Sequence, residues 1–181
     1  MSAAFQRVPY EVLADYERRS LMHSATRPET EQAQGSWTGI AFRLMDADLV
    51  SGIDDVKEVL TLPDVTVVPG SVNWVLGIAN VRGNLVPIID LRCFLTTQMT
   101  SISDSSRVLV VPQETGNVGL LVDEVLGQRH FMSEDASDRR PIEGHELSIY
   151  AGNCFSRGGV DWTEFEVSKL VTDPKFHQAA A

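Results

Sequence analysis

The side chains best suited to catalysis or metal binding are spread thinly through this 181-residue chain. No histidine lies three or four residues from another histidine or from a cysteine, the spacing that metal sites favour. The four histidines are His23, His130, His145 and His177. The motifs GxSxG, GxGxxG and GxxxxGK(S/T) do not occur. The adjacent carboxylates Asp54 and Asp55 would point apart on a strand or a helix, which indicates a solvated pair. We therefore expect no enzyme, no catalytic residue, no metal site and no cofactor.

Composition narrows the class of protein further. The formal net charge is -10, which disfavours nucleic acid as a partner because phosphate binding needs clustered Lys and Arg. Cys93 and Cys154 stand far apart and predict buried, reduced thiols. The N-terminus lacks a basic segment followed by an apolar run, and no apolar run approaches the length of a membrane span. These features predict a cytoplasmic protein without direct membrane insertion.

The elements that must position any functional side chain fall into three parts. Residues 8–24 have apolar side chains at helical spacing, and residues 25–36 are polar and predict a linker. From Trp37 to residue 172, short apolar runs alternate with Gly, Pro, Asp and Asn, a pattern typical of a mostly β domain. Residues 173–181 predict a flexible tail. The expected organisation is therefore an N-terminal helix and linker (1–36), one β domain (37–172) and a tail.

Four hairpins are expected in the β domain. Strands at 39–45 and 49–53 flank a turn at residues 46–48, and strands at 108–111 and 118–122 flank residues 114–117. Strands at 76–81 and 85–89 flank Arg82-Gly83-Asn84, in which Gly83-Asn84 is the predicted two-residue loop. Strands at 147–155 and 162–167 flank Gly158-Gly159.

An internal repeat relates two of these hairpins. Residues 40–56 align with residues 109–125 without a gap, at an offset of 69 residues. Five apolar positions coincide: Ile40, Phe42, Leu49, Ile53 and Val56 fall on Leu109, Val111, Val118, Val122 and Val125. Two unrelated amphipathic hairpins would share some of this alternation. The matching turn, strand lengths and trailing acidic residues favour a duplication into two related β half-domains.

Residues 68–95 contain features that a plain core strand avoids. Gly77 interrupts an apolar strand and suggests a bulge or a close backbone approach. Pro87 cannot donate to a strand ladder, so its strand is expected to lie at an edge or to contain a bulge. Arg82 precedes the hairpin loop, where its guanidinium would project outward.

This segment resembles the CheW-like family, whose motif it matches in one ungapped run. The matching residues are Gly77, Asn80, Arg82, Gly83, Pro87, Asp90 and Leu91. The resemblance extends upstream to residues 55–59 and downstream to residues 118–125, and covers about residues 37–170. The additional N-terminal helix and longer C-terminal part resemble the PilI-like branch of the family, which serves type IV pilus twitching motility.

The resemblance implies a fold of two small five-stranded SH3-like β-barrels forming one domain. It also implies a non-enzymatic adaptor, recruited to membrane receptor arrays, that couples the cytoplasmic tip of a methyl-accepting chemoreceptor to the regulatory domain of a CheA-like histidine kinase. The implied receptor- or kinase-binding residues are Val56, Glu58, Arg82 and Gly83. The implied structural residues are Gly77, Asn80, Pro87, Asp90 and Gly119.

Other interpretations stay open at the level of sequence. Glu58 could be a solvated strand charge, Arg82 could only brace the hairpin through a salt bridge, and the glycines could be purely structural. Two alternative functions also remain: an isolated regulatory module of a histidine kinase, and a small-barrel nucleic-acid-binding protein, which the acidic charge opposes.

Overall fold

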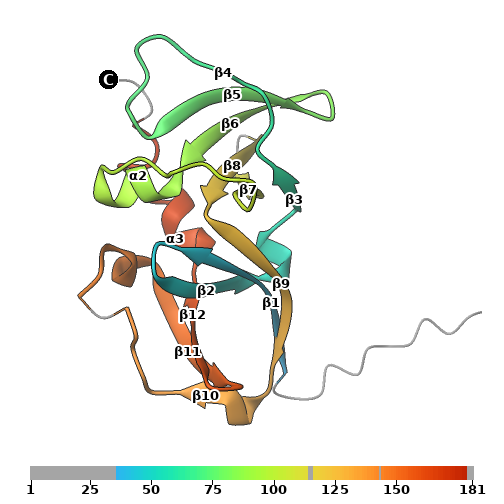
Figure 1. The fold of residues 1–181 in the computed structure, drawn as a ribbon, viewed down its shortest axis with the longest axis vertical. Coiled ribbons are helices and arrows are strands. Elements are labelled where there is room, and N and C mark those ends of the chain that lie inside the picture. Colours follow the sequence, from blue (N-terminus) through green and yellow to red (C-terminus); the bar gives the residue numbers. More distant parts are fainter. Residues whose placement is uncertain (1–35, 114–115, 143, 179–181) are drawn as a thin grey trace, which may run out of the picture. The chain divides into compact units, whose positions relative to one another are not determined.

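The computed structural model describes residues 36–113, 116–142 and 144–178, and the helix predicted at residues 8–24 lies outside them. Within these ranges the strands form two six-stranded sheets, so the mostly β prediction is confirmed (Figure 1). Sheet A has the order β10 (Ala136–Ser137), β11 (Ala151–Arg157), β12 (Val160–Phe165), β2 (Ala47–Gly52), β1 (Trp37–Leu44), β9 (Glu124–Phe131). Sheet B has the order β3 (Glu58–Thr61), β7 (Arg107–Gln113), β8 (Gly116–Val122), β6 (Asn84–Asp90), β5 (Val75–Val81), β4 (Val65–Thr66). Each sheet has one strand more than expected, and each includes one strand of only two residues, β4 or β10.

In the described part of the chain, four short helices lie between strands, and a fifth follows the last strand. They are η1 (Ile53–Asp55), α2 (Leu91–Thr96), η2 (Ser133–Asp135), η3 (Glu146–Tyr150) and α3 (Val167–Val171). The α2 helix follows β6 in sheet B, and α3 follows β12 in sheet A. The strands that lead into these helices, β6 and β12, occupy equivalent positions: each is the third strand counted from the two-residue strand at the edge of its sheet.

The two sheets share one connectivity, which supports the predicted duplication. Leu44 pairs with Ala47 across β1 and β2, and 69 residues later Gln113 pairs with Gly116 across β7 and β8. The β2 strand then pairs parallel with β12, as β8 does with β6. A second correspondence, at an offset of 76 residues, places the β5–β6 hairpin on the β11–β12 hairpin. The repeat therefore extends beyond the segments that the sequence revealed.

The halves also exchange strands. After the β1–β2 hairpin the chain crosses to sheet B, where β3 pairs with β7. After the β7–β8 hairpin it crosses back to sheet A, where β9 pairs with β1. Each sheet therefore needs a hairpin from the other half of the chain, β1–β2 in sheet A and β7–β8 in sheet B, and neither half can complete its sheet alone.

Three hydrophobic clusters stabilise this arrangement. One cluster of buried side chains, including Val108 and Leu121, belongs to sheet B, and a second, including Phe131 and Trp162, belongs to sheet A. The third combines both sheets and the helices, with Phe42 of β1, Leu109 of β7 and Phe94 of α2. Separating the sheets would expose the apolar side chains of this shared cluster, at about 25 cal/mol per Å² of apolar surface. The shared cluster therefore joins the two sheets into one domain.

Two predicted turns lie one residue away from their expected positions. The first is Met45-Asp46, because the buried Ala47 already pairs with Leu44 at the start of β2. The second is Arg82-Gly83 and not Gly83-Asn84, because Asn84 pairs with Val81. In both turns a non-glycine residue adopts positive φ, 59° at Met45 and 51° at Arg82, which the sequence does not favour.

Two predictions near the C-terminus are corrected. Residues 147–150 form the 3-10 helix η3 and not a strand, and Val167 begins α3. The expected flexible tail is anchored at Phe176, which is only 5% exposed and stacks on Trp74. The Asp173 carboxylate accepts a hydrogen bond from the Tyr150 hydroxyl at 2.6 Å. An aromatic anchor therefore holds a segment whose sequence is otherwise polar.

Candidate functional site

The tip of the β5–β6 hairpin is the most sharply defined exposed feature among the predicted site residues. Its two loop residues both have positive φ, 51° at Arg82 and 87° at Gly83, as a type I′ turn requires. The Asn80 side-chain oxygen accepts a hydrogen bond of 2.8 Å from the Gly83 backbone N–H. Val81 and Asn84 close the ladder below the loop. The tip is therefore a tight turn held by a side-chain cap.

Arg82 and Glu58 come together at this tip although they lie on separate strands. A guanidinium nitrogen of Arg82 lies 2.9 Å from Glu58 Oε2, with the Arg82 side chain 78% exposed and that of Glu58 20% exposed. Glu58 Oε2 is shielded from solvent. Its contact with Arg82 is an ion pair, because the angles do not meet those of a hydrogen bond. A surface ion pair contributes only about 0–1 kcal/mol to stability. Because a guanidinium has five N–H donors, most of the Arg82 head remains open to a partner.

The other two predicted contact residues occupy different surroundings. Val56 is only 9% exposed and belongs to the core shared by the sheets, so its side chain supports β3 from within. The next residue, Lys57, donates its backbone N–H to Val110 O at 2.8 Å and starts the pairing of β3 with β7. A Cβ added to Gly83 would meet nothing within 4 Å, so this glycine is needed for its φ and not for space.

The predicted structural glycines are tightly enclosed. A Cβ on Gly77 would lie 2.2 Å from the Thr66 carbonyl oxygen, and the β5–β6 register shifts between Val75 and Gly77. Both the bulge and the close backbone approach expected at Gly77 are therefore present. A Cβ on Gly119 would lie 2.6 Å from Ile88 Cδ1.

Asp90 and Pro87 lie in β6, and the Asp90 side chain holds the base of the hairpin. The buried Asp90 carboxylate accepts hydrogen bonds from Cys93 N at 3.0 Å, Thr100 N at 2.8 Å and Thr100 Oγ1 at 2.7 Å. It therefore caps α2 and anchors the following loop. Pro87 lies in an interior strand of sheet B, one residue before the parallel pairing with β8 begins at Ile88. The prediction of an edge strand or a bulge at Pro87 is therefore wrong: β6 is interior, and the bulge lies in the neighbouring strand β5.

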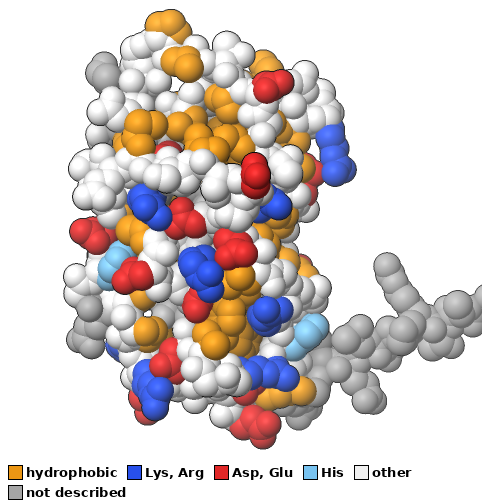
Figure 2. Space-filling model, in the orientation of Figure 1, with side chains coloured by type: hydrophobic (Ala, Val, Ile, Leu, Met, Phe, Trp, Pro, Cys, Tyr) orange, Lys and Arg blue, Asp and Glu red, His pale blue; other side chains and the backbone are white. Residues whose placement is uncertain are grey.

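Sequence reasoning missed Leu85, which is 75% exposed beside the tip. It lies opposite the exposed Asn80 across the hairpin, and the exposed Pro87 follows two residues later. The signal was present in the alternation of β6, because Val86 and Ile88 face the core and leave Leu85 outward. Figure 2 shows hydrophobic side chains exposed over the end of the molecule that holds β4, β5 and β6. The tip thus combines a guanidinium with an apolar neighbour.

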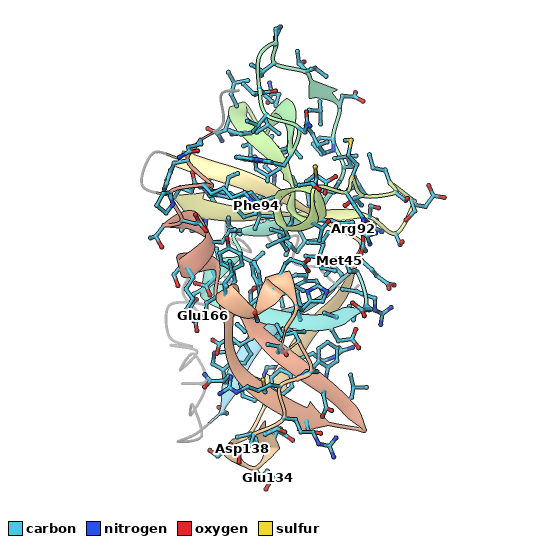
Figure 3. The ribbon with its side chains drawn as sticks, turned by 90° about the vertical axis from the view of Figure 1, so that its left-hand side faces the viewer. Met45, Arg92, Phe94, Glu134, Asp138 and Glu166 are labelled. Carbon is cyan, nitrogen blue, oxygen red and sulfur yellow. The ribbon has the colours of Figure 1, made fainter. Side chains whose placement is uncertain are left out.

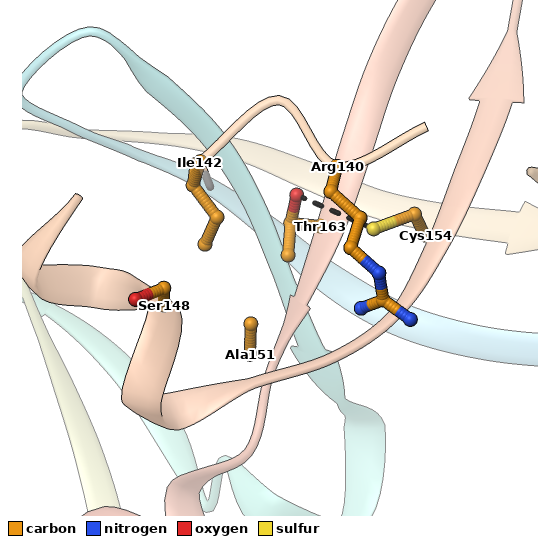
Figure 4. A pocket seen from close by; sticks show the side chains of 6 residues that line it. All are labelled: Arg140, Ile142, Ser148, Ala151, Cys154 and Thr163. Carbon is orange, nitrogen blue, oxygen red and sulfur yellow. Dashed lines mark hydrogen bonds between the residues drawn. The ribbon is translucent and has the colours of Figure 1, made fainter. Parts of the chain in front are cut away.

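Away from the hairpin tip, one pocket of about 130 Å³ is lined by Asp46, Asp48, His145 and Asp161 among others. A cavity of about 120 Å³ is lined by six residues, none of which is a carboxylate or an imidazole (Figure 4). They are Arg140, Ile142, Ser148, Ala151, Cys154 and Thr163. Cys154 Sγ lies 3.9 Å from Thr163 Oγ1. Both cysteines are free and buried, as predicted, and no group of three metal-binding side chains occurs among the described residues.

A polar contact links the two sheets on another face. Asp123 follows β8, and its Oδ2 accepts hydrogen bonds from Arg92 at 2.7 Å and from the Met45 backbone N–H at 2.6 Å. Figure 3 shows Arg92 of α2 and Met45 of the β1–β2 turn on facing sides of this junction. The contact fixes the sheets relative to each other at the crossing into β9. Within the described ranges, no helix is long and apolar enough to cross a membrane.

Comparisons with known proteins agree with the geometry. Residues 38–172 match the model of the CheW-like domain. The chain is 40% identical to Protein PilI of Pseudomonas aeruginosa over 174 residues, covering 96% of this chain and 97% of that protein. It is 31% identical to Chemotaxis protein CheW of Thermotoga maritima over 88 residues, covering 49% of this chain and 58% of that protein. The crystal structure of scaffolding protein TtCheW from Thermoanaerobacter tengcongensis matches with a TM-score of 0.62 and 22% identity, covering 71% of this chain and 88% of that one.

Proposed function

The chain belongs to the CheW-like family, and from this membership we propose that it is a non-enzymatic adaptor that couples a methyl-accepting chemoreceptor to a CheA-like histidine kinase. Its similarity to Protein PilI over nearly the whole chain supports a place in the pilus branch of such signalling. The adaptor works in the cytoplasm and is recruited to membrane receptor arrays. It acts by holding receptor and kinase in a fixed relation, with no bond made or broken.

The observation that carries the receptor contact is the Arg82 tip. Protein interfaces concentrate their binding energy in a few anchors, often Arg, surrounded by contacts that add little energy but exclude water. Arg82 is exposed on a capped turn, and Leu85 places an exposed apolar side chain two residues beyond it in the same hairpin. Glu58 holds one edge of the guanidinium. The contact residues are therefore Glu58, Arg82 and Gly83, while Val56 supports β3 from the core.

The kinase contact uses a different surface. Met132 and Val160 are exposed hydrophobic side chains at sheet A, the sheet that does not carry the Arg82 hairpin. Because the kinase's regulatory domain is expected to share this fold, it can pack against this side of the domain. A receptor contact and a kinase contact on separate surfaces are what a coupling protein requires.

Substitution of Arg82 by Glu tests the receptor contact. The variant should lose binding to an immobilised receptor cytoplasmic-tip fragment, because it reverses the charge of the anchor and repels Glu58. Thermal unfolding should change little, since an exposed ion pair contributes about 0–1 kcal/mol.

Arg139→Glu is the matched control. Arg139 is 73% exposed and forms one ion pair, 3.1 Å from Asp161, on the other sheet. This control should bind the receptor fragment like the wild type. Retention of Arg82→Glu at the wild-type level would remove Arg82 from the contact.

A further inference from the structure

The Asn80 side chain serves a backbone group that a two-residue hairpin leaves unpaired. The strand ladder closes at Val81 and Asn84, so the N–H of the second loop residue, Gly83, has no ladder partner. Asn80 Oδ1 accepts this N–H at 2.8 Å. The bond closes a ring around Arg82, whose φ of 51° is disfavoured for a residue with a Cβ.

The duplication supplies an internal comparison. In the equivalent β11–β12 hairpin, Gly158 and Gly159 stand where β5–β6 has Arg82 and Gly83, and their φ values are 62° and 80°. The turn geometry is the same, but two glycines adopt it without a Cβ penalty. The residue equivalent to Asn80 is Ser156, whose hydroxyl bonds to Asp161.

The acid of the ion pair is also missing from the second hairpin. In sheet B, Glu58 pairs with Val110. The repeat equivalent of Val110 in sheet A is Ala41, which pairs with Gly127. Gly127 therefore stands where sheet B has Glu58. The sheet A hairpin thus has neither the Arg82–Glu58 pair nor, among its described residues, a side-chain cap on its loop. The cap occurs in the hairpin whose loop contains an arginine.

We propose that Asn80 is a positioning residue for Arg82: its side-chain amide holds the loop so that the guanidinium meets Glu58 and faces a partner. This inference rests on the proposed receptor contact and deepens it. It assigns Asn80 a role in partner affinity in addition to the structural role that the family motif implies.

The test uses the full chain in two arms. In the first arm, NMR measures the intraresidue HN–Hα NOE and the Cα shift of Arg82, which report its left-handed backbone without any partner. Asn80→Ala should shift both toward averaged values, and Asn80→Asp should keep them because a carboxylate accepts the same hydrogen bond. Ser156→Ala is the control and should leave Arg82 unchanged.

In the second arm, affinity is measured for a receptor cytoplasmic-tip fragment made as a soluble coiled-coil fusion. Asn80→Ala should weaken binding by about 2- to 10-fold, the value of one hydrogen bond. Asn80→Asp should recover most of that loss. The double variant with Arg82→Ala should bind no more weakly than Arg82→Ala alone, because Asn80 acts through Arg82.

The outcomes separate the two claims. Unchanged Arg82 parameters in Asn80→Ala, or losses that multiply in the double variant, would overturn the role of Asn80 while leaving the receptor contact intact. If Arg82→Ala binds like the wild type, the proposed contact fails, and with it the role of Asn80 in affinity.

Discussion

Phe176→Ala probes the aromatic anchor that fixes the C-terminal segment. Phe176 stacks on Trp74 at 6.1 Å between ring centroids and meets Phe94 edge-on at 5.4 Å. Its side chain is 5% exposed. Trp74 precedes β5 and Phe94 lies in α2, so the anchor joins the chain's end to the sheet B side of the core.

The magnitude follows from this burial. Replacing a buried Phe by Ala costs about 3–5 kcal/mol in protein cores. The cost here should lie near the lower limit, about 3 kcal/mol, because a terminal segment can fray and regain conformational entropy. For a domain of this size, about 2–4 °C per kcal/mol gives a fall in Tm of about 6–12 °C.

Chemical denaturation followed by circular dichroism measures the change. Ile149→Ala is the control, since Ile149 is 65% exposed and its truncation should change the free energy of unfolding by less than about 0.5 kcal/mol. Removal of residues 173–181 should cost at least as much as Phe176→Ala. A loss below about 1 kcal/mol in Phe176→Ala would refute the packing of this segment.

Three further predictions concern stability. Burial, and after it the neighbouring carboxylates, raises the pKa of Asp55 above 3.8, so ionisation of Asp55 opposes folding. Asp55→Asn should therefore unfold at a higher temperature than the wild type at pH 7. This difference in unfolding temperature should shrink as the pH falls through the raised pKa of Asp55. The hydrogen bond from the Tyr150 hydroxyl lowers the pKa of Asp173, so the stability from this bond is present at neutral pH and is lost as the pH falls below about 4. Tyr150→Phe should lower the free energy of unfolding by about 1 kcal/mol at pH 7, and by less at pH 3, as measured by urea titration. Gly77→Ala should lower the free energy of unfolding by more than about 3 kcal/mol, because its Cβ would clash with a backbone carbonyl. Gly83→Ala should lower it by only about 1–2 kcal/mol, because only backbone strain is added there. Thermal unfolding measures both.

The parts of the fold that depend on local pattern could be predicted from the sequence. Alternating apolar residues identified the hairpins and the 69-residue repeat, since a strand's faces are set by neighbours two residues apart. The exchange of the β1–β2 and β7–β8 hairpins between the sheets could not be predicted, because it depends on pairing between distant strands. The turns were misplaced because Met45 and Arg82 adopt positive φ, where glycine or asparagine would be expected.

The candidate site was predicted in part. Family resemblance selected Glu58 and Arg82, and the structure pairs them, although nothing in their spacing indicates contact. Val56 was expected near the same contact but is buried, because the segment before β3 faces the shared core. Phe176 gave no signal, since one aromatic residue in a polar tail has no periodicity.

Bridging is the most direct test of the coupling proposal. A receptor cytoplasmic-tip fragment is fixed on beads, and the regulatory domain of a CheA-like kinase is added with or without this chain. We expect the kinase domain to be retained only when the chain is present. Arg82→Glu should abolish this retention yet still bind the kinase domain in solution, and Arg139→Glu should bridge like the wild type. Equal retention without the chain, or full bridging by Arg82→Glu, would contradict the coupling role assigned to the Arg82 tip.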